Sequence, residues 1–591
     1  MKFHNATTLS ATTLILLAGS MPGHGFDFNY NSSGNAQHWS FNPPDPSIST
    51  NVFNRNTHSI RFFIASDGYS TTNTAAELNA VRNCFGQWQS VPNTIVKYED
   101  AGLVAPGYDV NTSDNTNVVY WAKTSTVVNG GMNDISGALA VTFSSFTDPG
   151  NEILQFDIVI NGVENGWFTD FNDTDDPNNF FVEGSLAHEI GHSLGLSHAA
   201  IGGATMLYSG QTGVDTQAGL SVDEVAFART LYPSGNIQTT LGNLKGTVTK
   251  SGSPVFGAAV ILEGTNGNLA GGTVTLANGT YILNSVPPGN YNVRVWPLDP
   301  SSAANWLIQG QDISSSFDGA DTSFLPTGNT PVTLAAGTTN TLNLTVTNGT
   351  PAFRITLIRT PVTDPGSYSI ISLPTTITPG QSNYTIGVFS ADLPTSGATF
   401  TITGDGLTLG SPTYDPDGSV FTGLNGISMS ISVASNATPG LRTFIVQQGG
   451  NVAYANGFLE VLPLIPDYNF DGLDDRFQRQ YFFPFTSTNA APNADPDGDG
   501  VNNYAEYVAG TDPTDPTSFL KMLSTTTAAN GTTVVWRSVA GKQYQLMSRT
   551  DLGSGSWQNV GSPLVANGAT AQQLDSSATN GIHFYKVQVF P

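Results

Sequence analysis

The stretch His188-Glu189-Ile190-Gly191-His192-Ser193-Leu194-Gly195-Leu196-Ser197-His198 decides how the first part of this chain folds. Residues four apart lie on one face of a helix, so His188 and His192 can direct imidazole nitrogens at one metal ion. A third ligand cannot follow on the next helical turn without distortion. Gly195 is suited to end the helix in a left-handed conformation, which carries His198 to the same ion. The spacing therefore predicts one zinc ion held by three histidines, with a fourth position open to water.

Glu189 follows His188 directly in the sequence, so its carboxylate can reach a water that is bound at the open position of the zinc ion. Zinc lowers the pKa of a bound water to about 7, and Glu189 can accept the proton of that water as it attacks a peptide carbonyl. The same carboxylate can then protonate the leaving amine. We therefore expect a zinc-dependent endopeptidase that hydrolyses protein substrates, with Glu189 as its general base.

A methionine follows the third histidine by eight residues, in Ala204-Thr205-Met206-Leu207-Tyr208. Together with the histidine motif it resembles the metzincin clan, whose second signature is a methionine turn beneath the zinc. The resemblance implies that Met206 is a hydrophobic support under the ligands. Tyr208 stands two residues later, as in astacins and serralysins, where this tyrosine ligates zinc or stabilises the oxyanion. A packing or pocket role is the alternative for Tyr208.

Within that clan, residues 37–233 resemble a bacterial matrixin. The resemblance is carried by Trp39, Phe85-Gly86-Gln87-Trp88, Gly137-Ala138-Leu139-Ala140, the segment 156–161 and Leu231-Tyr232-Pro233. It implies an α+β domain with a mixed five-stranded sheet, an active-site helix and a methionine turn. The strands are expected at 60–64, 95–99, 118–122, 138–142 and 156–160. Substrate should bind extended along the edge strand near 137–140, with the specificity pocket beside residues 206–219.

Two departures from the animal matrixins stand out. No histidine lies between His58 and His188, so the second, structural zinc of that family is expected to be missing. No propeptide fits between a signal sequence and Trp39, and no Pro-Arg-Cys-Gly-like segment exists, so latency by a cysteine switch is not expected.

An acidic loop precedes the zinc helix. Six carboxylates and no basic residue lie from Glu164 to Glu183. Such a run is usually a solvated loop. Because the resembled family uses calcium in this region, we expect a calcium ion here, with Asp173, Asp175 and Asp176 as ligands.

A second acidic segment matches an EF-hand-type calcium loop. Carboxylates occupy loop positions 1, 3, 5 and 12, and Gly500 stands at position 6. A backbone carbonyl is supplied at position 7. The expected calcium ligands are Asp495, Asp497, Asp499, Val501 and Glu506.

A weaker copy of the loop starts 28 residues earlier, with expected ligands Asp467, Asn469, Asp471 and Leu473. Gln478 replaces the bidentate glutamate of this copy, and Asp474 or Asp475 could substitute for it. Together the two loops resemble thrombospondin type-three calcium repeats, which would make an ion-stiffened spacer. The alternative is a dockerin-like pair, which would imply a cohesin partner.

Charge and composition limit the function further. The 591 residues include 45 acidic and 20 basic ones, and a surface so short of Lys and Arg argues against nucleic acid as a partner. Residues 26–235 hold 22 acidic against 6 basic residues, and residues 464–519 hold 10 against 2. The acidity thus collects on the two segments where metal ions are expected, which predicts a calcium-dependent fold.

The N-terminal residues indicate export. Lys2, an apolar run over 14–18 and the small residues Gly19 and Ser20 are typical of a signal peptide, residues 1–25. No later apolar stretch has the length of about 20 residues that a membrane-spanning helix needs. We therefore expect a secreted, extracellular protein. Its one cysteine, Cys84, cannot close an internal disulfide and falls on the apolar face of an expected helix.

The remaining chain is rich in short strands and turns. The pattern around Gly279-Thr280-Tyr281 and Val286-Pro287-Pro288-Gly289-Asn290-Tyr291 resembles the transthyretin-like or carboxypeptidase-regulatory β-sandwich. The expected domains are a signal peptide (1–25), a metzincin catalytic domain (26–235), this β-sandwich (242–348), an Ig-like β-domain (349–463), calcium repeats (464–519) and a C-terminal β-module (520–591).

Two functions are consistent with this organisation. In the first, the chain is a secreted peptidase whose β-modules attach it to a cell surface or matrix. In the second, it is an adhesin or glycan-binding protein with an inactive peptidase domain. The intact Glu189 favours the peptidase, because a relaxed site would be expected to lose that residue first.

Overall fold

The computed structural model describes residues 29, 35–147, 150–173, 178–210, 212–214, 217–298, 319–360, 369–371, 373–415 and 423–590. The chain divides into two compact units, residues 1–468 and 469–591. The expected signal peptide, residues 1–25, lies outside the described residues. Over the part of the chain that is described, no helix is both long and apolar enough to cross a membrane.

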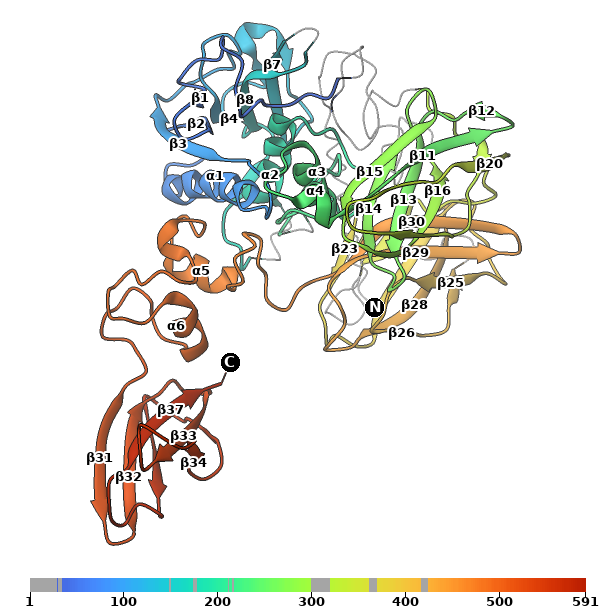
Figure 1. Ribbon diagram of the computed structural model, residues 1–591. Coiled ribbons are helices and arrows are strands. Elements are labelled where there is room, and N and C mark those ends of the chain that lie inside the picture. The colour runs from blue at the N-terminus through green and yellow to red at the C-terminus, as the bar shows by residue number, and fades with distance from the viewer. Residues whose placement is uncertain are drawn as a thin grey trace, which may run out of the picture. The chain divides into compact units, whose positions relative to one another are not determined.

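A mixed sheet begins the first unit (Figure 1). Its strand order is β1-β2-β4-β8-β7, and β3 also pairs with β2. The strands are β1 (Phe53–Asn54), β2 (Ser59–Ala65), β3 (Tyr98–Val104), β4 (Val118–Ala122), β7 (Ala140–Phe146) and β8 (Ile153–Asn161). Strands β2, β3, β4 and β8 run parallel, whereas β1 and β7 run antiparallel to their neighbours.

The sequence analysis expected five strands, whereas the sheet has six. The additional strand is β1, whose two residues pair with the start of β2. Two strands also begin later than expected. Strand β3 begins at Tyr98, where its pairing with Ile60 starts. Strand β7 begins at Ala140, because the Ala138 amide donates to the carbonyl of Ile135 in a turn.

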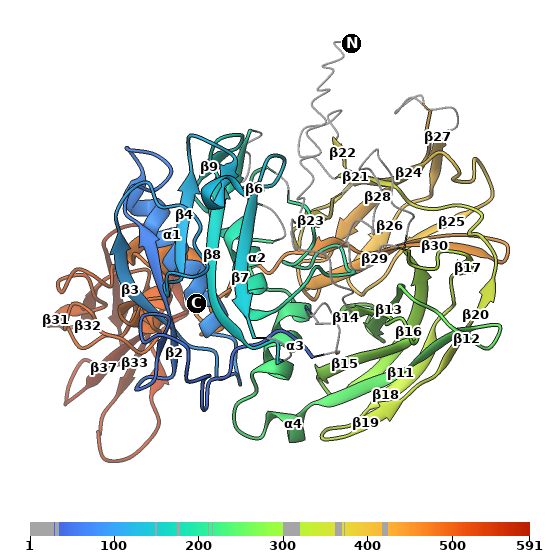
Figure 2. The ribbon, with the colours of Figure 1, turned by 90° about the horizontal axis from the view of Figure 1, so that it is seen from above.

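Helices α1 (Thr74–Gln89) and α2 (Val182–Leu194) pack against each other on one face of this sheet, behind β4, β8 and β7 in Figure 2. Strand β4 is buried along its whole length, as expected for a strand that is covered on both faces. Phe85 of α1 stacks on Phe62 of β2 with ring centroids 3.9 Å apart, and Cys84 is fully buried next to it. The expectation of a buried thiol at Cys84 is therefore confirmed.

Two buried polar contacts fix the helix pair. Glu183, in the first turn of α2, accepts hydrogen bonds from the amides of Asn83 (2.7 Å) and Gln87 (3.2 Å) on α1. The Trp88 indole donates to the Ala187 carbonyl at 2.8 Å. Because the groups are buried, each bond fixes the register of one helix against the other.

The rest of this region is short elements. Helix α3 (Val222–Leu231) starts with a capping box formed by Ser221 and Glu224, and α4 (Ile237–Thr240) follows. The small strands are β5 (Val127–Val128), β6 (Asn133–Asp134), β9 (Gly166–Phe168) and β10 (Asn179–Phe181), with a 3-10 turn at Asn129–Gly131.

Two sheets form the next region of the first unit. One contains β11 (Gly242–Lys250), β12 (Ser253–Pro254), β15 (Thr280–Val286), β17 (Phe324–Leu325), β19 (Thr339–Thr341) and β20 (Leu344–Asn348). The other has the order β14-β13-β16-β18, with β13 (Ala258–Gly264), β14 (Leu269–Val274), β16 (Gly289–Pro297) and β18 (Thr330–Leu334). Alternating burial along β11 is typical of a strand that covers a core with one face.

A second pair of sheets completes the first unit. The first sheet is built from β21 (Leu357–Thr360), β22 (Ser369–Ile371), β24 (Tyr384–Ser390), β26 (Leu407–Leu409), β27 (Thr413–Asp415) and β28 (Asn425–Val433). The second has the order β23-β30-β29-β25, with β23 (Thr375–Ile377), β25 (Thr399–Ile402), β29 (Gly440–Gln448) and β30 (Asn451–Val461).

The second unit combines two short helices with a small β-module. Helices α5 (Asp475–Tyr481) and α6 (Asn503–Ala509) lie in the acidic segment. The β-module has one sheet of β31 (Met522–Ala528), β32 (Gly531–Arg537) and β36 (Thr570–Asp575), and another of β33 (Gln543–Arg549), β34 (Gln558–Asn559), β35 (Leu564–Val565) and β37 (Phe584–Val589). Trp536, Tyr544 and Leu546 form its buried core.

Candidate metal centre

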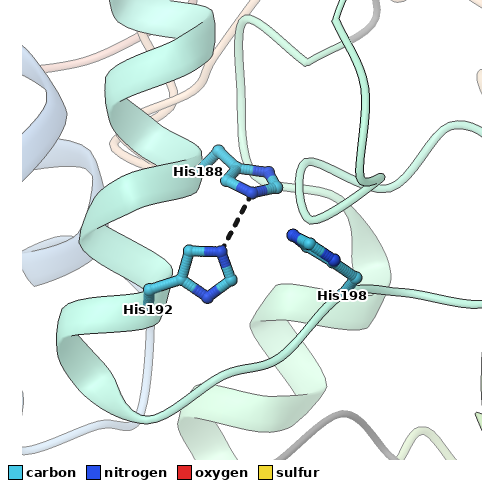
Figure 3. A group of neighbouring side chains, drawn as sticks. All are labelled: His188, His192 and His198. Carbon is cyan, nitrogen blue, oxygen red and sulfur yellow. Dashed lines mark hydrogen bonds between the residues drawn. The ribbon is translucent and has the colours of Figure 1, made fainter. Parts of the chain in front are cut away.

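Three histidine side chains converge on one point at the end of helix α2 (Figure 3). His188 and His192 extend from the helix, and His198 comes from the chain that leaves it. One ligand atom from each lies within 4.8 Å of the other two. The Nε2 atoms of His188 and His192 are 3.1 Å apart. The structure thus brings together all three zinc ligands that the sequence spacing predicts.

Backbone carbonyls set the orientation of two of the rings. Nδ1 of His188 bonds the Thr205 carbonyl at 2.9 Å, and Nδ1 of His192 bonds the Leu196 carbonyl at 2.8 Å. Since a carbonyl only accepts, each Nδ1 carries the proton and each Nε2 presents a lone pair. Burial lowers the pKa of His188 to about 3 and that of His192 to about 4. Both imidazoles are therefore neutral at neutral pH, which is the form that binds a metal.

The donor set fits zinc. Three converging imidazoles with a carboxylate nearby match the catalytic sites in which three protein ligands leave one position for water. Apart from these histidines, the described residues contain one further group with metal-ligand geometry, Asp495, Asp497 and Asp499 in the second unit.

Gly195 turns the chain from the helix toward His198. It caps α2 with φ 104° and ψ 10°, a left-handed conformation that side chains rarely adopt. A Cβ at this position would stand 2.1 Å from the carbonyl oxygen of Gln37. Both the conformation and the space therefore require glycine.

Aromatic side chains satisfy the carbonyls at the end of α2. The Trp39 indole donates to the Ser193 carbonyl at 2.8 Å, and the Tyr232 hydroxyl donates to the Leu194 carbonyl at 2.6 Å. Such carbonyls have no partner within the helix itself. Trp39 and Tyr232 thus hold the helix end that carries His192, a role that the sequence analysis did not assign to them.

Met206 packs against helix α2 between the positions of His188 and His192. It is 1% exposed, and Gly191 of α2 is so close that a Cβ there would stand 2.4 Å from the methionine sulfur. Glu224 of α3 is fully buried and accepts hydrogen bonds from the amides of Met206 (3.0 Å) and Thr205 (3.2 Å). Sequence reasoning missed Glu224. Its capping-box spacing after Ser221 was the available signal, but that signal indicates a helix start and not a bond to this turn.

Glu189 is 1% exposed and lies on the same helix as the first two histidines. The Thr142 hydroxyl, on β7, is 2.7 Å from Glu189 Oε2 and 2.9 Å from the Glu189 carbonyl oxygen. Burial raises the pKa of Glu189 to about 8, and the Thr142 hydroxyl opposes that rise. Thr142 was also missed, because a threonine in a strand has no distinctive spacing to a helix 47 residues later.

A small cavity of about 20 Å³ adjoins the centre. Its lining includes His188, Glu189, Leu139, Leu207 and Gln217. Leu207 and Gln217 belong to the segment 206–219, beside which the sequence analysis expected the specificity pocket. Tyr208 lies next to the site, with its ring centroid 6.5 Å from that of His198.

The acidic loop before α2 is only partly described. Asp173 is exposed, and its amide donates to the Asp170 carbonyl at 3.1 Å. The other two expected calcium ligands, Asp175 and Asp176, lie outside the described residues.

The loop that starts at Asp495 is arranged around its carboxylates. The amides of Gly498 and Gly500 donate to the two Asp495 oxygens at 2.9 Å each. Four buried oxygens receive no hydrogen bond from the described residues; they are Asp497 Oδ2, Asp499 Oδ2, Asn503 Oδ1 and Glu506 Oε2. Burial and the neighbouring carboxylates raise the pKa of Glu506 to about 7. Asn503, at loop position 9, was not among the expected ligands.

The loop that starts at Asp467 differs from the loop at Asp495. The Gln478 amide donates to Asp471 Oδ2 at 2.8 Å, and the Asn469 amide donates to the same oxygen at 3.0 Å. The Leu473 amide donates to Asp471 Oδ1 at 2.9 Å. Both oxygens of the expected ligand Asp471 therefore already accept hydrogen bonds, whereas Oδ1 of Asn469 is buried with no donor among the described residues.

Comparison with known proteins gives two kinds of result. No curated protein matches the chain. Solved structures that match in part include the minor pilin GBS52 of Streptococcus agalactiae (13% identity, 18% of this chain and 45% of that chain, TM-score 0.13). Others are the 5-hydroxyisourate hydrolase of Klebsiella pneumoniae (15%, 22% and 90%, TM-score 0.12) and the Bacillus anthracis TIE protein (11%, 59% and 45%, TM-score 0.14). The chain spans less than half the length of the pilin and of the TIE protein, and likenesses at these TM-scores support no functional statement.

Family models give the more specific result. Residues 243–347 match the model described as carboxypeptidase regulatory-like domain, and residues 53–233 match the model described as matrixin. These matches confirm the two family resemblances that the sequence motifs indicated. The histidine triad lies within the second match, so the chain contains a matrixin domain that carries this triad, followed by a carboxypeptidase regulatory-like domain.

Proposed function

We propose that residues 26–235 form a secreted zinc endopeptidase in which Glu189 is the general base. The observation that carries the proposal is that three imidazoles converge while Glu189, from the same helix, lines the same cavity as His188. Burying a carboxylate is costly, and the Thr142 hydroxyl is a neutral partner that offsets little of the cost. A buried carboxylate with a strongly shifted pKa beside a metal site is typical of a catalytic group.

The chain's own residues account for the proton transfers. Zinc bound by the histidines would supply a Lewis acid that polarises a peptide carbonyl and lowers the pKa of a water. Thr142 holds Oε2 of Glu189, so Oε1 takes the proton of the attacking water. Glu189 then passes this proton to the nitrogen of the leaving peptide. Burial raises the pKa of Glu189 in the metal-free chain, and a cation bound by the histidines would favour the ionised form that accepts a proton.

Strand β7 supplies a surface for an extended substrate. It is the last strand of its sheet, so one edge of its backbone does not pair within that sheet. Leu139, just before β7, lines the cavity beside Glu189. A peptide added along this edge would run past the metal centre, with backbone hydrogen bonds giving affinity and the cavity selecting a side chain.

The test is the variant Glu189→Gln, compared with Glu99→Gln as a matched control. Glu99 pairs with Arg61 at the far side of the sheet and makes no contact with the centre. We expect Glu189→Gln to retain one zinc per chain and to lose at least about 100-fold in kcat/KM on a denatured protein, whereas Glu99→Gln remains active. Wild-type-like cleavage by Glu189→Gln would contradict the role of this residue.

A second experiment separates the peptidase from an adhesin with an inactive peptidase domain. A diverse, proteome-derived peptide digest is incubated with the wild-type chain, with calcium supplied, and cleavage is read by mass spectrometry with and without a zinc chelator. A protein that carries zinc and cleaves no peptide would support the adhesin. The β-modules are proposed to attach the enzyme to a cell surface or matrix in either case.

We further propose that the loop at Asp495 binds calcium through Asp495, Asp497, Asp499, the Val501 carbonyl and Glu506. The buried oxygens of this loop support the proposal, because oxygens that are removed from water without a donor are costly unless a cation satisfies them. The loop at Asp467 is a weaker candidate, since amide donors already satisfy Asp471.

A further inference from the structure

The segment between the third histidine and the methionine is buried throughout. Residues 199–206, here called the 199–206 loop, contain no exposed or half-exposed residue. Ile201 at its centre is 0% exposed. A connecting segment normally runs over the surface. Something must therefore cover this one.

The cover comes from both β-sandwich regions. Gly272 of β14 lies so close to Ile201 that a Cβ on Gly272 would stand 2.8 Å from Ile201 Cγ2. The Phe458 ring of β30 lies against Gly202, where a Cβ would stand 2.4 Å from the ring, and the Gly202 amide donates to the Asn456 carbonyl at 2.8 Å. These partners lie beyond residue 233, where the matrixin match ends.

The loop is tied to the metal ligands at both ends. His198 directly precedes it, and the Ala199 amide donates to the Met206 carbonyl at 2.8 Å. At the other end the Thr205 carbonyl accepts the hydrogen bond from Nδ1 of His188. A displacement of the loop would therefore move one ligand and release the ring orientation of another.

A buried arginine joins the two sandwiches behind the loop. Arg294 of β16 is 0% exposed and donates to Glu263 (2.9 Å) in its own sandwich. It also donates to Asn456 Oδ1 (2.9 Å) and to Thr443 Oγ1 (2.8 Å) in the next one. Asn456 thus contacts Arg294 with its side chain and Gly202 with its backbone. Because Arg294 is buried, these bonds favour one docked arrangement, since a shifted one would leave the charges of Arg294 and Glu263 unpaired.

Helix α3 makes a second connection. Figures 1 and 2 both show α3 beside β14 and β15. Asp223 at its start accepts a hydrogen bond from the Gly272 amide at 3.1 Å, while the neighbouring Glu224 holds Thr205 and Met206. The same helical turn therefore faces the β-sandwich on one side and the methionine turn on the other.

We propose that the β-sandwiches of residues 242–348 and 349–463 position the zinc ligands by seating the 199–206 loop, with Gly202 and Phe458 as the positioning residues. The inference rests on the proposed zinc-binding function of the triad. The absence of side chains at Gly202 and Gly203 lets the second sandwich approach the loop closely. Phe458 acts on the centre through the loop and does not touch the reacting atoms.

The test uses two Gly→Ala variants of the full chain that create the same clash in different places. Gly202→Ala places a Cβ 2.4 Å from the Phe458 ring at the loop. Gly426→Ala places a Cβ 2.3 Å from the Phe389 ring inside the second sandwich and serves as the matched control. Zinc affinity of the metal-free proteins is measured by chelator competition, and the visible absorption of the cobalt-substituted proteins reports ligand geometry.

We expect Gly202→Ala to weaken zinc binding by about 10-fold or more and to alter the cobalt spectrum, as changes behind metal ligands do. Gly426→Ala should keep wild-type zinc affinity and spectrum. The double variant Gly202→Ala/Phe458→Ala, which removes the clashing ring, should recover most of the affinity. The inference would be overturned by wild-type affinity in a folded Gly202→Ala, by equal losses in both single variants, or by no recovery in the double variant.

Failure of the proposed catalytic function would look different. In that case the wild-type chain binds zinc but cleaves no peptide, and the affinity and spectral comparison of the variants still decides whether the sandwiches position the ligands. If the wild-type chain binds no zinc, the metal site and this inference are both wrong.

Discussion

Gly191 provides the sharpest test of how the methionine turn supports the zinc helix. A Cβ at this position would stand 2.4 Å from Met206 Sδ and 3.2 Å from both Met206 Cε and Trp88 Cζ2. Met206 is 1% exposed and Trp88 is 0% exposed, so neither side chain can move into solvent. Gly191→Ala gains about 1 kcal/mol in helix propensity, while overpacking a core costs about 1 to 3 kcal/mol. The expected result is a net destabilisation of up to about 2 kcal/mol.

Hydrogen exchange of helix α2 in the full, zinc-loaded chain measures this change locally. A loss of about 2 kcal/mol speeds exchange through opening of the helix about 30-fold. Met206→Ala makes room for the new methyl group, so Gly191→Ala/Met206→Ala should be less destabilised than the sum of the single variants by about 1 kcal/mol or more. Strictly additive effects, or unchanged exchange in Gly191→Ala, would refute the steric argument.

Three other changes have defined outcomes. Gly195→Ala should prevent stoichiometric zinc binding, because the left-handed turn and the Gln37 carbonyl leave no place for a Cβ; a folded variant with full zinc content would contradict this. Burial raises the pKa of Asp157 from 3.8 to about 7, so the folded chain holds a proton that the unfolded chain has released between these pH values. Stability should therefore fall as pH rises through that window, by at most about 1.4 kcal/mol per pH unit, and Asp157→Asn should remove this slope in unfolding curves. Glu506→Gln should abolish the calcium-dependent protection from hydrogen exchange at residues 495–506, and protection equal to wild type would exclude Glu506 as a ligand.

The metal ligands could be predicted from the sequence because their geometry is local. His188 and His192 are one helical turn apart, and Gly195 acts within the same short segment, so spacing alone determines the arrangement. Met206 was found for a different reason. Its role followed from the family resemblance, since nothing in a lone methionine indicates a position beneath a metal.

The groups that hold these ligands could not be predicted in the same way. Thr142 contacts Glu189 across 47 residues, and the Trp39 indole reaches Ser193 across 154. A threonine in a strand and a tryptophan near the start of a domain are equally consistent with simple packing. Only the fold brings them to the helix, because sheet pairing and helix docking decide which distant residues become neighbours.

The two acidic loops show a limit of pattern matching. Both have Asp at positions 1 and 5 and Gly at position 6, and the weaker one differs in Asn469 at position 3 and Gln478 at position 12. In the structure the amides of Gln478 and Asn469 donate to Asp471. Among the described residues, buried oxygens without a donor remain on Asn469 in this loop and on Asp497, Asp499, Asn503 and Glu506 in the loop at Asp495. One substitution at the last loop position thus replaces an acceptor by a donor, and the affinity for a cation should fall with it.

The boundary of the matrixin domain is where sequence and structure differ most. Tyr232-Pro233 ends the last helix of the matrixin match, and a domain end at this point is what composition indicates. Yet Ile201, next to the third zinc ligand, is buried by β14. Exposing an isoleucine of this kind costs about 1.5 to 3 kcal/mol, which is a large part of the stability of a small domain. The alternation of apolar residues along a strand shows which face of a sheet covers the core of its own sandwich. It does not show which surface packs against a neighbouring domain. The smallest piece of this chain that keeps the 199–206 loop buried therefore extends to β30, well beyond the matched domain.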